Sequence, residues 1–439
     1  MVAVLNKCSS ILAGEPSLGT PFSINAINQL TDQSLDLTTS IHWHGIFQKR
    51  TNYVDGVSFV TQCPIIPNDT FVYNFNALNQ SGTFWYHSHL RNQYCDGLRG
   101  AFIIDDPDDP HRNLYDVDND DTIITLADWY HYLSTNRPAV PAFNSTLING
   151  KSRYPDRPAN VSLAVVNVRR YRFRLISISC DPNFTFSIDG HQMTVIEVEG
   201  NNVQPLRVDS LEIFAAQRYS VVVNANQPVD NYCKSSLGRG FLQANLTKTG
   251  MRALPNAAGR NFSNLNNLAV LHYAGAPDTN PTVDPTVNIP VSKLPLVETN
   301  LHPLTPSQRQ TPFPAGADIN INVDVVLYLR SPAQQGVELT IPGGAIGGPH
   351  PVHLHGHAFS VVRSAGNDSY NFDTPVIRDV VSIGNASDNV TIRFSTDNPG
   401  PWFFHCHIDW HLAAGFAIVF AEDVPDVLRR TLRMASFLA

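Results

Sequence analysis

Residues 400–416 read GPWFFHCHIDWHLAAGF and place Cys406 between His405 and His407, with His411 four residues beyond the second histidine. A buried cysteine usually behaves as a small apolar residue, but three neighbouring histidines make a ligand role the better interpretation. In an extended strand, residues i and i+2 project from the same face. We therefore expect one face of this strand to carry two imidazoles and the opposite face to carry the thiol.

Histidine pairs of the form H-x-H occur at four places along the chain. A single histidine in a core is more often hydrogen-bonded structure than a ligand, but four pairs, each aiming two rings from one strand face, indicate metal binding. The pairs alone do not identify the metal, because imidazole suits zinc, copper, iron and nickel. The pairs are His42/His44, His87/His89, His353/His355 and His405/His407.

Cys406 narrows the choice to copper. Two histidines and one thiolate with a weak or absent axial ligand describe a blue-copper electron-transfer site, and His350 and His411 are the histidines that complete it. Phe416 or Ile408, rather than a methionine, stands where the axial ligand would be, which should raise the reduction potential. Zinc has no redox chemistry and would leave the thiol without a use.

Four copper ions use the whole ligand set. The eight imidazoles of the four pairs can hold three ions with two, three and three ligands, and the thiol with its two histidines holds the fourth. Four coppers match the four electrons that reduce O₂ to two waters. The sequence thus predicts copper-based electron transfer to oxygen.

Composition favours a turn-rich β protein and excludes several classes. Of the 439 residues, 43% are hydrophobic and 15% charged, with 31 prolines and 26 glycines. The net charge of −8 comes without a basic cluster, so we expect no nucleic-acid partner. No apolar run approaches the roughly 20 residues of a membrane span, and the first residues lack the pattern of a signal peptide. Sequons nevertheless favour a secreted glycoprotein; they include Asn68, Asn144, Asn183 and Asn389.

Short β-rich runs separated by turn residues predict sandwiches or barrels. Breaks rich in Pro and Asp at 105–121 and 274–290 divide the chain into three units, which we place at 1–107, 108–275 and 276–439. A weak internal repeat relates the outer two. GTFWYHSHLRNQYCDGLRGAF parallels GPWFFHCHIDWHLAAGFAIVF, and HWHG parallels HLHG. The first and last units therefore look like copies of one module, and the middle unit has none of the pairs.

With these motifs in place, the sequence resembles the multicopper oxidases, most closely the basidiomycete fungal laccases. The resemblance rests on HWHG, TFWYHSHLRNQYCDGLRG, HPVHLHGHAF and NPGPWFFHCHIDWHLAAGFA. It implies an all-β fold of three consecutive cupredoxin-like Greek-key domains, with the first and third incomplete. Position by position it implies a type 2 copper on His42 and His353, a type 3 pair on His44, His87, His89, His355, His405 and His407, and a type 1 copper on His350, Cys406 and His411.

The resemblance also implies a reaction, in which phenols or aromatic amines, including those of lignin, are oxidised while O₂ is reduced to water. Asp181 resembles the carboxylate that accepts the phenolic proton beside His411, although from the residues alone it is equally well a turn aspartate. Asp55 resembles an acid that relays protons to the oxygen site. Cys95 and Cys180 resemble a family disulfide, and His357 resembles no ligand. We expect a secreted monomer.

Several segments depart from the family pattern. The start (1–21), the segment 233–251 and the end (426–439) differ from it, and the third domain is short before Val326. Our hypothesis is that these departures are errors of the gene model, the alternative being a genuine divergent isoform. An inactive or misassembled relative and an oxidase of Fe(II) or Mn(II) remain alternative functions. The last would need acidic side chains beside the type 1 site, where Ala413 and Ala414 supply none.

Overall fold

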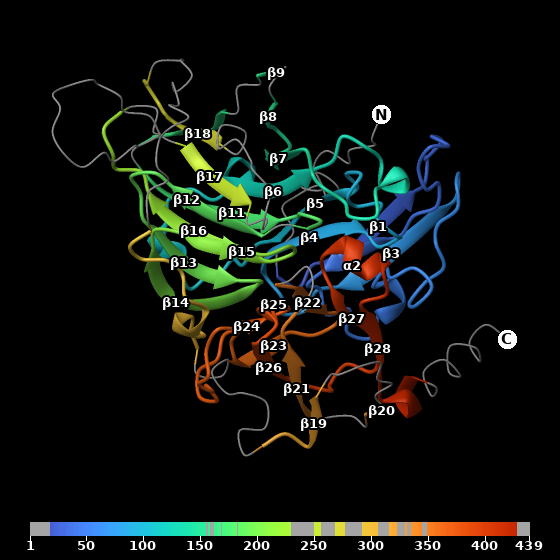
Figure 1. The fold of residues 1–439 in the computed structure, drawn as a ribbon. Coiled ribbons are helices and arrows are strands. Elements are labelled where there is room, and N and C mark those ends of the chain that lie inside the picture. Colours follow the sequence, from blue (N-terminus) through green and yellow to red (C-terminus); the bar gives the residue numbers. More distant parts are fainter. Residues whose placement is uncertain are drawn as a thin grey trace.

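The structure is a computed structural model, and it confirms a nearly all-β chain. It describes residues 18–154, 157–158, 162–167, 169–181, 183–229, 250–255, 268–276, 292–305, 316–322, 330–331, 335–344 and 349–427. Within these ranges no sheet combines strands from two of the three units expected from the sequence. Figure 1 shows the three parts, blue, green and orange-red, meeting near the centre of the molecule.

The first part carries two small sheets. Strand β1 pairs with β3 in antiparallel register, and β2, β4 and β5 form a second sheet in that order. Alternate residues of β1 are buried, so Phe22 and Ile24 pack into a core with Trp43, Phe75 and Phe102. The strands are β1 (Pro21–Ile27), β2 (Ile41–His44), β3 (Thr70–Asn76), β4 (Gly82–Ser88) and β5 (Arg99–Ile104).

The middle part is a sandwich of a five-stranded sheet, β10-β18-β17-β12-β15, and a six-stranded sheet, β14-β13-β16-β11-β6-β7. Its strands are β6 (Ile123–Trp129), β7 (Ser145–Ile148), β8 (Arg153–Tyr154), β9 (Arg157–Pro158), β10 (Ser162–Val166), β11 (Arg170–Ser177), β12 (Phe184–Ile188), β13 (Met193–Val198), β14 (Asn201–Val208), β15 (Leu211–Ile213), β16 (Arg218–Asn224), β17 (Gly250–Pro255) and β18 (Leu268–Tyr273). Apolar residues of both sheets form its core.

The last part has two five-stranded sheets, β19-β21-β26-β23-β24 and β20-β28-β27-β22-β25. Its elements are β19 (Ile319–Asn322), β20 (Arg330–Ser331), β21 (Gly336–Pro342), β22 (Pro351–Leu354), β23 (Phe359–Arg363), β24 (Ile377–Arg378), β25 (Val380–Ser382), β26 (Asn389–Ser395), β27 (Gly400–Cys406), helix α2 (Asp409–Ala413) and β28 (Ala417–Glu422).

Helices contribute little to the described part of the chain. Besides α2 there are a helical turn at 424–427 and single 3₁₀ turns at Asn52–Val54, Arg112–Leu114, Asp120–Thr122, Ser134–Asn136 and Glu298–Asn300. None of the helices among these residues has the length and apolar character needed to cross a bilayer.

The segments that depart from the family pattern fall mostly outside the described residues. This holds for 1–17, 233–249, 323–329 and 428–439. Gly250 and Met251, placed in the unusual segment 233–251 by the sequence analysis, instead begin strand β17, where Met251 pairs with Ile188. The last two residues of that segment therefore belong to the sandwich.

One apolar cluster joins all three parts. It contains Trp85 from β4, Ile176 from β11 and Cys406 from β27, together with Trp410 of α2. Because strands carrying H-x-H pairs end at this junction, packing of the three parts fixes their histidines relative to one another.

Candidate metal centre

Each pair of H-x-H strands is held in register by its sheet. In the first part, β2 runs antiparallel to β4 and His42 lies opposite His87. In the last part, β22 runs antiparallel to β27 and His353 lies opposite His405. The same relation in both sheets is what a duplicated module predicts.

The two sheets bring their histidines face to face. The rings of His42 and His355 stack with centroids 4.0 Å apart, and those of His44 and His353 stack at 3.8 Å. The other four rings meet crosswise, with His87 5.3 Å from His407 and His89 5.3 Å from His405. Each contact between the modules thus has a reciprocal partner, and all eight side chains are buried.

One ring nitrogen of each histidine is left for a ligand. Nε2 has no hydrogen-bond partner in five rings, namely those of His42, His87, His89, His353 and His407. The Nε2 atoms of His355 and His405 face each other at 3.1 Å. His44 is the exception, because its Nε2 lies 3.1 Å from the Asp379 carboxylate and its Nδ1 is the atom without a partner.

These nitrogens fit a metal better than they fit a closed core. A buried polar atom without a partner costs about 1–3 kcal/mol, and six such nitrogens in one place would be hard to retain without a ligand. Burial also lowers the pKa of seven of these rings, to about 4 for His405, and mutual repulsion lowers it further for most of the seven; they are His44, His87, His89, His353, His355, His405 and His407. These seven imidazoles are therefore neutral at pH 7, with lone pairs available for a cation.

The second cluster lies on the other side of β27. Cys406 Sγ is 3.5 Å from His350 Nδ1 and 3.7 Å from His411 Nδ1, and those two nitrogens are 3.0 Å apart. Cys406 is completely buried, and burial raises the pKa of its thiol. A bound cation would reverse this effect, because a coordinating thiol is deprotonated. His411 is only half buried, so this cluster opens to solvent on its side.

The residues expected at the axial position lie beside this cluster. The ring of Phe416 meets that of His350 edge to face with centroids 5.3 Å apart, and Phe416 is 41% exposed. Ile408 is buried. Neither brings a thioether or another donor atom, so an ion here would have an apolar side.

Two carboxylates orient the larger cluster. Asp55 is completely buried, accepts from His355 Nδ1 at 2.8 Å, and its backbone carbonyl accepts from His42 Nδ1 at 2.7 Å. Asp379 contacts His44 through its carboxylate, and its carbonyl accepts from His353 Nδ1 at 2.8 Å. Hydrogen bonds of this kind fix the tautomer and orientation of a ligating imidazole.

Sequence reasoning singled out Asp55 but missed Asp379. The sequence feature that could have identified Asp379 is a charged pair, Arg378 and Asp379, inside the apolar run VIRDVVSI. A charge in such a run must find a buried partner, but the sequence alone does not say which one.

Replacing Asp55 with asparagine is expected to weaken metal binding by the larger cluster. The amide is a poorer acceptor for His355 Nδ1, and losing such a partner typically lowers metal affinity about 10–100-fold. Competition with a chelator would measure the change. Asp373→Asn, on an exposed residue, is the control, and equal metal retention by the two variants would contradict the role of Asp55.

Two further candidates have different surroundings. His357 donates from Nδ1 to the His355 carbonyl at 3.0 Å, and its Nε2 lies 2.9 Å from Glu422, which raises its pKa. It is thus engaged in the core of the last part. Asp181 is half buried and close enough for its charge to raise the pKa of Cys406, though less than burial does.

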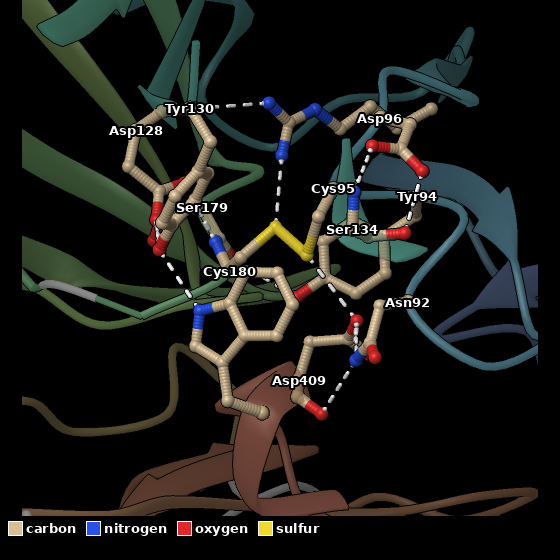
Figure 2. The surroundings of a disulfide bond; sticks show 12 residues. Asn92, Tyr94, Cys95, Asp96, Asp128, Tyr130, Ser134, Ser179, Cys180 and Asp409 are labelled. Carbon is tan, nitrogen blue, oxygen red and sulfur yellow. Dashed lines mark hydrogen bonds between the residues drawn. A yellow bond between two sulfur atoms is a disulfide. The ribbon is translucent and has the colours of Figure 1, made fainter. Parts of the chain in front are cut away.

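The disulfide expected between Cys95 and Cys180 is present. It links the first and middle parts across 85 residues of sequence, and both sulfurs are buried (Figure 2). The last part reaches it as well, because Asp409 Oδ2 lies 3.2 Å from Cys95 Sγ and the Asp409 amide donates to the Cys180 carbonyl at 2.9 Å. Asp409 stands between His407 and His411, so the bond supports the segment joining the two clusters.

Removing this disulfide by the double change Cys95→Ala and Cys180→Ala is expected to lower the free energy of unfolding by about 2–5 kcal/mol, since the unfolded chain regains the freedom of a long loop. The midpoint of urea unfolding would report the loss. Cys63→Ala removes an exposed free thiol and serves as control. An unchanged midpoint in the double variant would show that the bond contributes nothing to stability.

Comparisons with known proteins agree with this geometry. Three family models described as multicopper oxidase match residues 17–109, 120–276 and 297–426. Laccase-2 of Pleurotus ostreatus is 50% identical over 93% of this chain and 81% of its own length, and a laccase of Trametes maxima is 50% identical over 94% and 87%.

Solved structures give the same picture of the fold. A structure of Fet3p, described as a multicopper oxidase that functions in iron import, matches 93% of this chain and 84% of its own with a TM-score of 0.76 and 26% identity. The laccase of Botrytis aclada matches 92% and 80% with a TM-score of 0.72 and 29% identity.

The alignments also bear on the departures from the family pattern. The aligned span with the Pleurotus laccase is 454 residues, which is longer than the 439-residue chain. That relative therefore has residues, within the span, that have no counterpart here.

Proposed function

The chain belongs to the multicopper oxidase family and is a laccase-type member of it, and from this premise we propose that its two clusters oxidise phenols or aromatic amines at one end and reduce O₂ to water at the other. Copper is the cofactor that the family implies. When bound, it supplies the one-electron redox chemistry that links the two half-reactions. The protein supplies ligands, orientation and exclusion of water.

We assign four copper ions to the two clusters. The free nitrogens support His42 and His353 as ligands of one ion, and His44, His87, His89, His355, His405 and His407 as ligands of a pair. His350, Cys406 and His411 would hold the fourth. In the same scheme His44 binds through Nδ1, because its Nε2 is occupied by Asp379.

Strand β27 connects the two sites. Cys406 lies between His405 and His407 in the chain, so a few covalent bonds join the thiol to two imidazoles of the larger cluster. The half-buried edge of His411 is the place where an electron donor reaches the chain. Asp181, beside the same site, would accept the proton that a phenol loses on oxidation.

Within the larger cluster the protein excludes bulk water and places a carboxylic acid next to the histidines. All eight histidines are buried, and Asp55 contacts both His42 and His355. We propose that Asp55 passes protons to the oxygen site. The observation that carries the whole proposal is that strand β27 joins an enclosed cluster of eight histidines to a second cluster, in which Cys406 is buried and His411 is half exposed.

The test is oxygen uptake by the copper-loaded chain with a simple phenol, together with a count of copper per chain. The proposal expects about four copper ions and one O₂ consumed for every four electrons taken from the phenol. Material that is folded and copper-loaded but takes up no oxygen would contradict it. Hydrogen peroxide as the main product would also contradict it.

An oxidase of Fe(II) or Mn(II) has less support. The curated relatives at about 50% identity are laccases, and the exposed Ala413 and Ala414 next to His411 add no carboxylate that would hold a metal-ion substrate.

A secreted glycoprotein remains our proposal for its location. Asn68 and Asn144 are exposed and open to modification. Asn183 is buried and its side chain donates to Glu212, so it is not open to glycosylation in the folded chain. We also propose a monomer.

A further inference from the structure

We propose that Arg218 is a positioning residue through which the middle domain, which supplies none of the metal ligands, sets the geometry of the histidine cluster. The inference rests on the function proposed above. It concerns one fully buried guanidinium and its contacts with the other two domains.

Arg218 touches all three parts of the molecule. It begins strand β16 of the middle part, and its Nη1 donates to the Ala216 carbonyl at 3.1 Å. Its Nε donates to the Thr83 carbonyl on β4, at 3.1 Å. Both Nη atoms donate to the Asp379 carboxylate of the last part, each at 2.7 Å. Two parallel hydrogen bonds of this kind fix a carboxylate in orientation as well as in position.

Asp379 in turn fixes the orientation of two histidine rings from different domains. Its Oδ1 lies 3.1 Å from His44 Nε2, and its carbonyl accepts from His353 Nδ1 at 2.8 Å. The rings of His44 and His353 stack on each other. Because each ring is held at one nitrogen, the other nitrogen of each is the one left facing the cluster.

The backbone of the Asp379 segment is held from the middle domain too. Glu199 Oε2 accepts from the Asp379 amide at 2.7 Å and from the Val380 amide at 3.0 Å. The amide of Glu199 in turn donates to the Arg218 carbonyl at 3.2 Å. The turn after β13 and the start of β16 are therefore bonded to each other, and both hold the Asp379 segment in place by hydrogen bonds.

Gly45 shows how closely the pair is packed behind His44. A Cβ atom at Gly45 would lie 2.5 Å from Arg218 Nη2 and 2.9 Å from Asp379 Oδ2, and the residue has a φ of +89°. The glycine of the HWHG motif thus leaves the space that the ion pair occupies. A side chain there would separate the pair from the histidine it supports.

Arg218→Lys tests this role. Lysine keeps the charge but is a point donor that cannot bridge both carboxylate oxygens and also reach the Thr83 carbonyl. We expect copper retention by the histidine cluster to weaken about 10–100-fold, the usual cost of losing support behind a ligand. Chelator competition would measure it, and the electron paramagnetic resonance signal of the type 2 copper should change shape. The blue absorption of the Cys406 site, which Arg218 does not touch, should persist and report that the variant is folded.

The matched control is Arg172→Lys. Arg172 is another buried arginine of the middle part and pairs with Glu197 and Asp109. Neither carboxylate contacts a histidine of the cluster among the interactions of the described residues. The control should lose stability without any change in the type 2 signal.

Three outcomes would overturn the inference: an unchanged type 2 signal and copper retention in a blue Arg218→Lys protein, an equal change in Arg172→Lys, or an intact cluster in Asp379→Asn. The last variant decides the matter if Arg218→Lys does not fold, because it keeps the side-chain shape but replaces the charge and one of the two acceptor oxygens with an amide NH₂ group. Wild-type protein that fails to bind copper at the cluster would instead refute the proposed function.

Discussion

Replacing Cys406 with serine is expected to abolish the blue absorption, to remove one copper per chain and to reduce phenol-dependent oxygen uptake to background. Serine has nearly the same size but no thiolate, and its hydroxyl stays protonated where the sulfur would bind. The eight histidines on the opposite side of the strand are unchanged, so their copper should remain. The variant therefore separates loss of the entry site from loss of the oxygen site.

Cys63→Ser is the matched control for this change. It makes the same chemical substitution at an exposed free thiol and should leave colour, copper content and oxygen uptake as in the wild type. Cys406→Ser protein that still consumes oxygen at the wild-type rate would remove Cys406 from the electron path.

The metal-free chain is expected to lose stability steeply as the pH falls below about 6.5. Burial holds the pKa of His44, His87, His355 and His407 below 6.5 in the folded state, while the unfolded chain has ordinary histidines. Unfolding therefore takes up protons in acid, and each such histidine costs about 1.4 kcal/mol per pH unit. For His405 alone, with a pKa of about 4, the loss between pH 6.5 and pH 4 is about 3 kcal/mol.

Several such groups exceed the usual margin of roughly 5–15 kcal/mol, so we expect acid unfolding of the metal-free protein well above pH 4. Above pH 6.5 the effect vanishes, because both states are then neutral. Copper should move the loss to lower pH and raise the free energy of unfolding, by about 4 kcal/mol when free copper is 1,000 times its dissociation constant.

Urea midpoints at several pH values, with and without copper, would measure both effects. His131→Gln, at an exposed position, should leave the pH dependence unchanged, whereas His353→Gln should make it shallower. A metal-free protein equally stable at pH 7 and pH 5 would contradict the neutral, buried cluster.

Much of the candidate site could be predicted from the sequence, because the chemistry is local in the chain. Alternation in a strand places His405 and His407 on one side and Cys406 on the other, and three H-x-H pairs repeat the pattern. Short-range rules of this kind need no knowledge of the fold. The all-β class followed in the same way from the runs of alternating and β-branched residues.

What the tertiary structure decided are the relations between distant residues. That His42 stacks on His355 and His44 on His353 depends on how two sheets dock, which no local pattern encodes. The same holds for Arg218 and Asp379, 161 residues apart, and for the assignment of Nδ1 as the free nitrogen of His44 alone among the eight. A charged residue in an apolar strand indicates that a buried partner is needed, but only the packed chain brings that partner within hydrogen-bond distance.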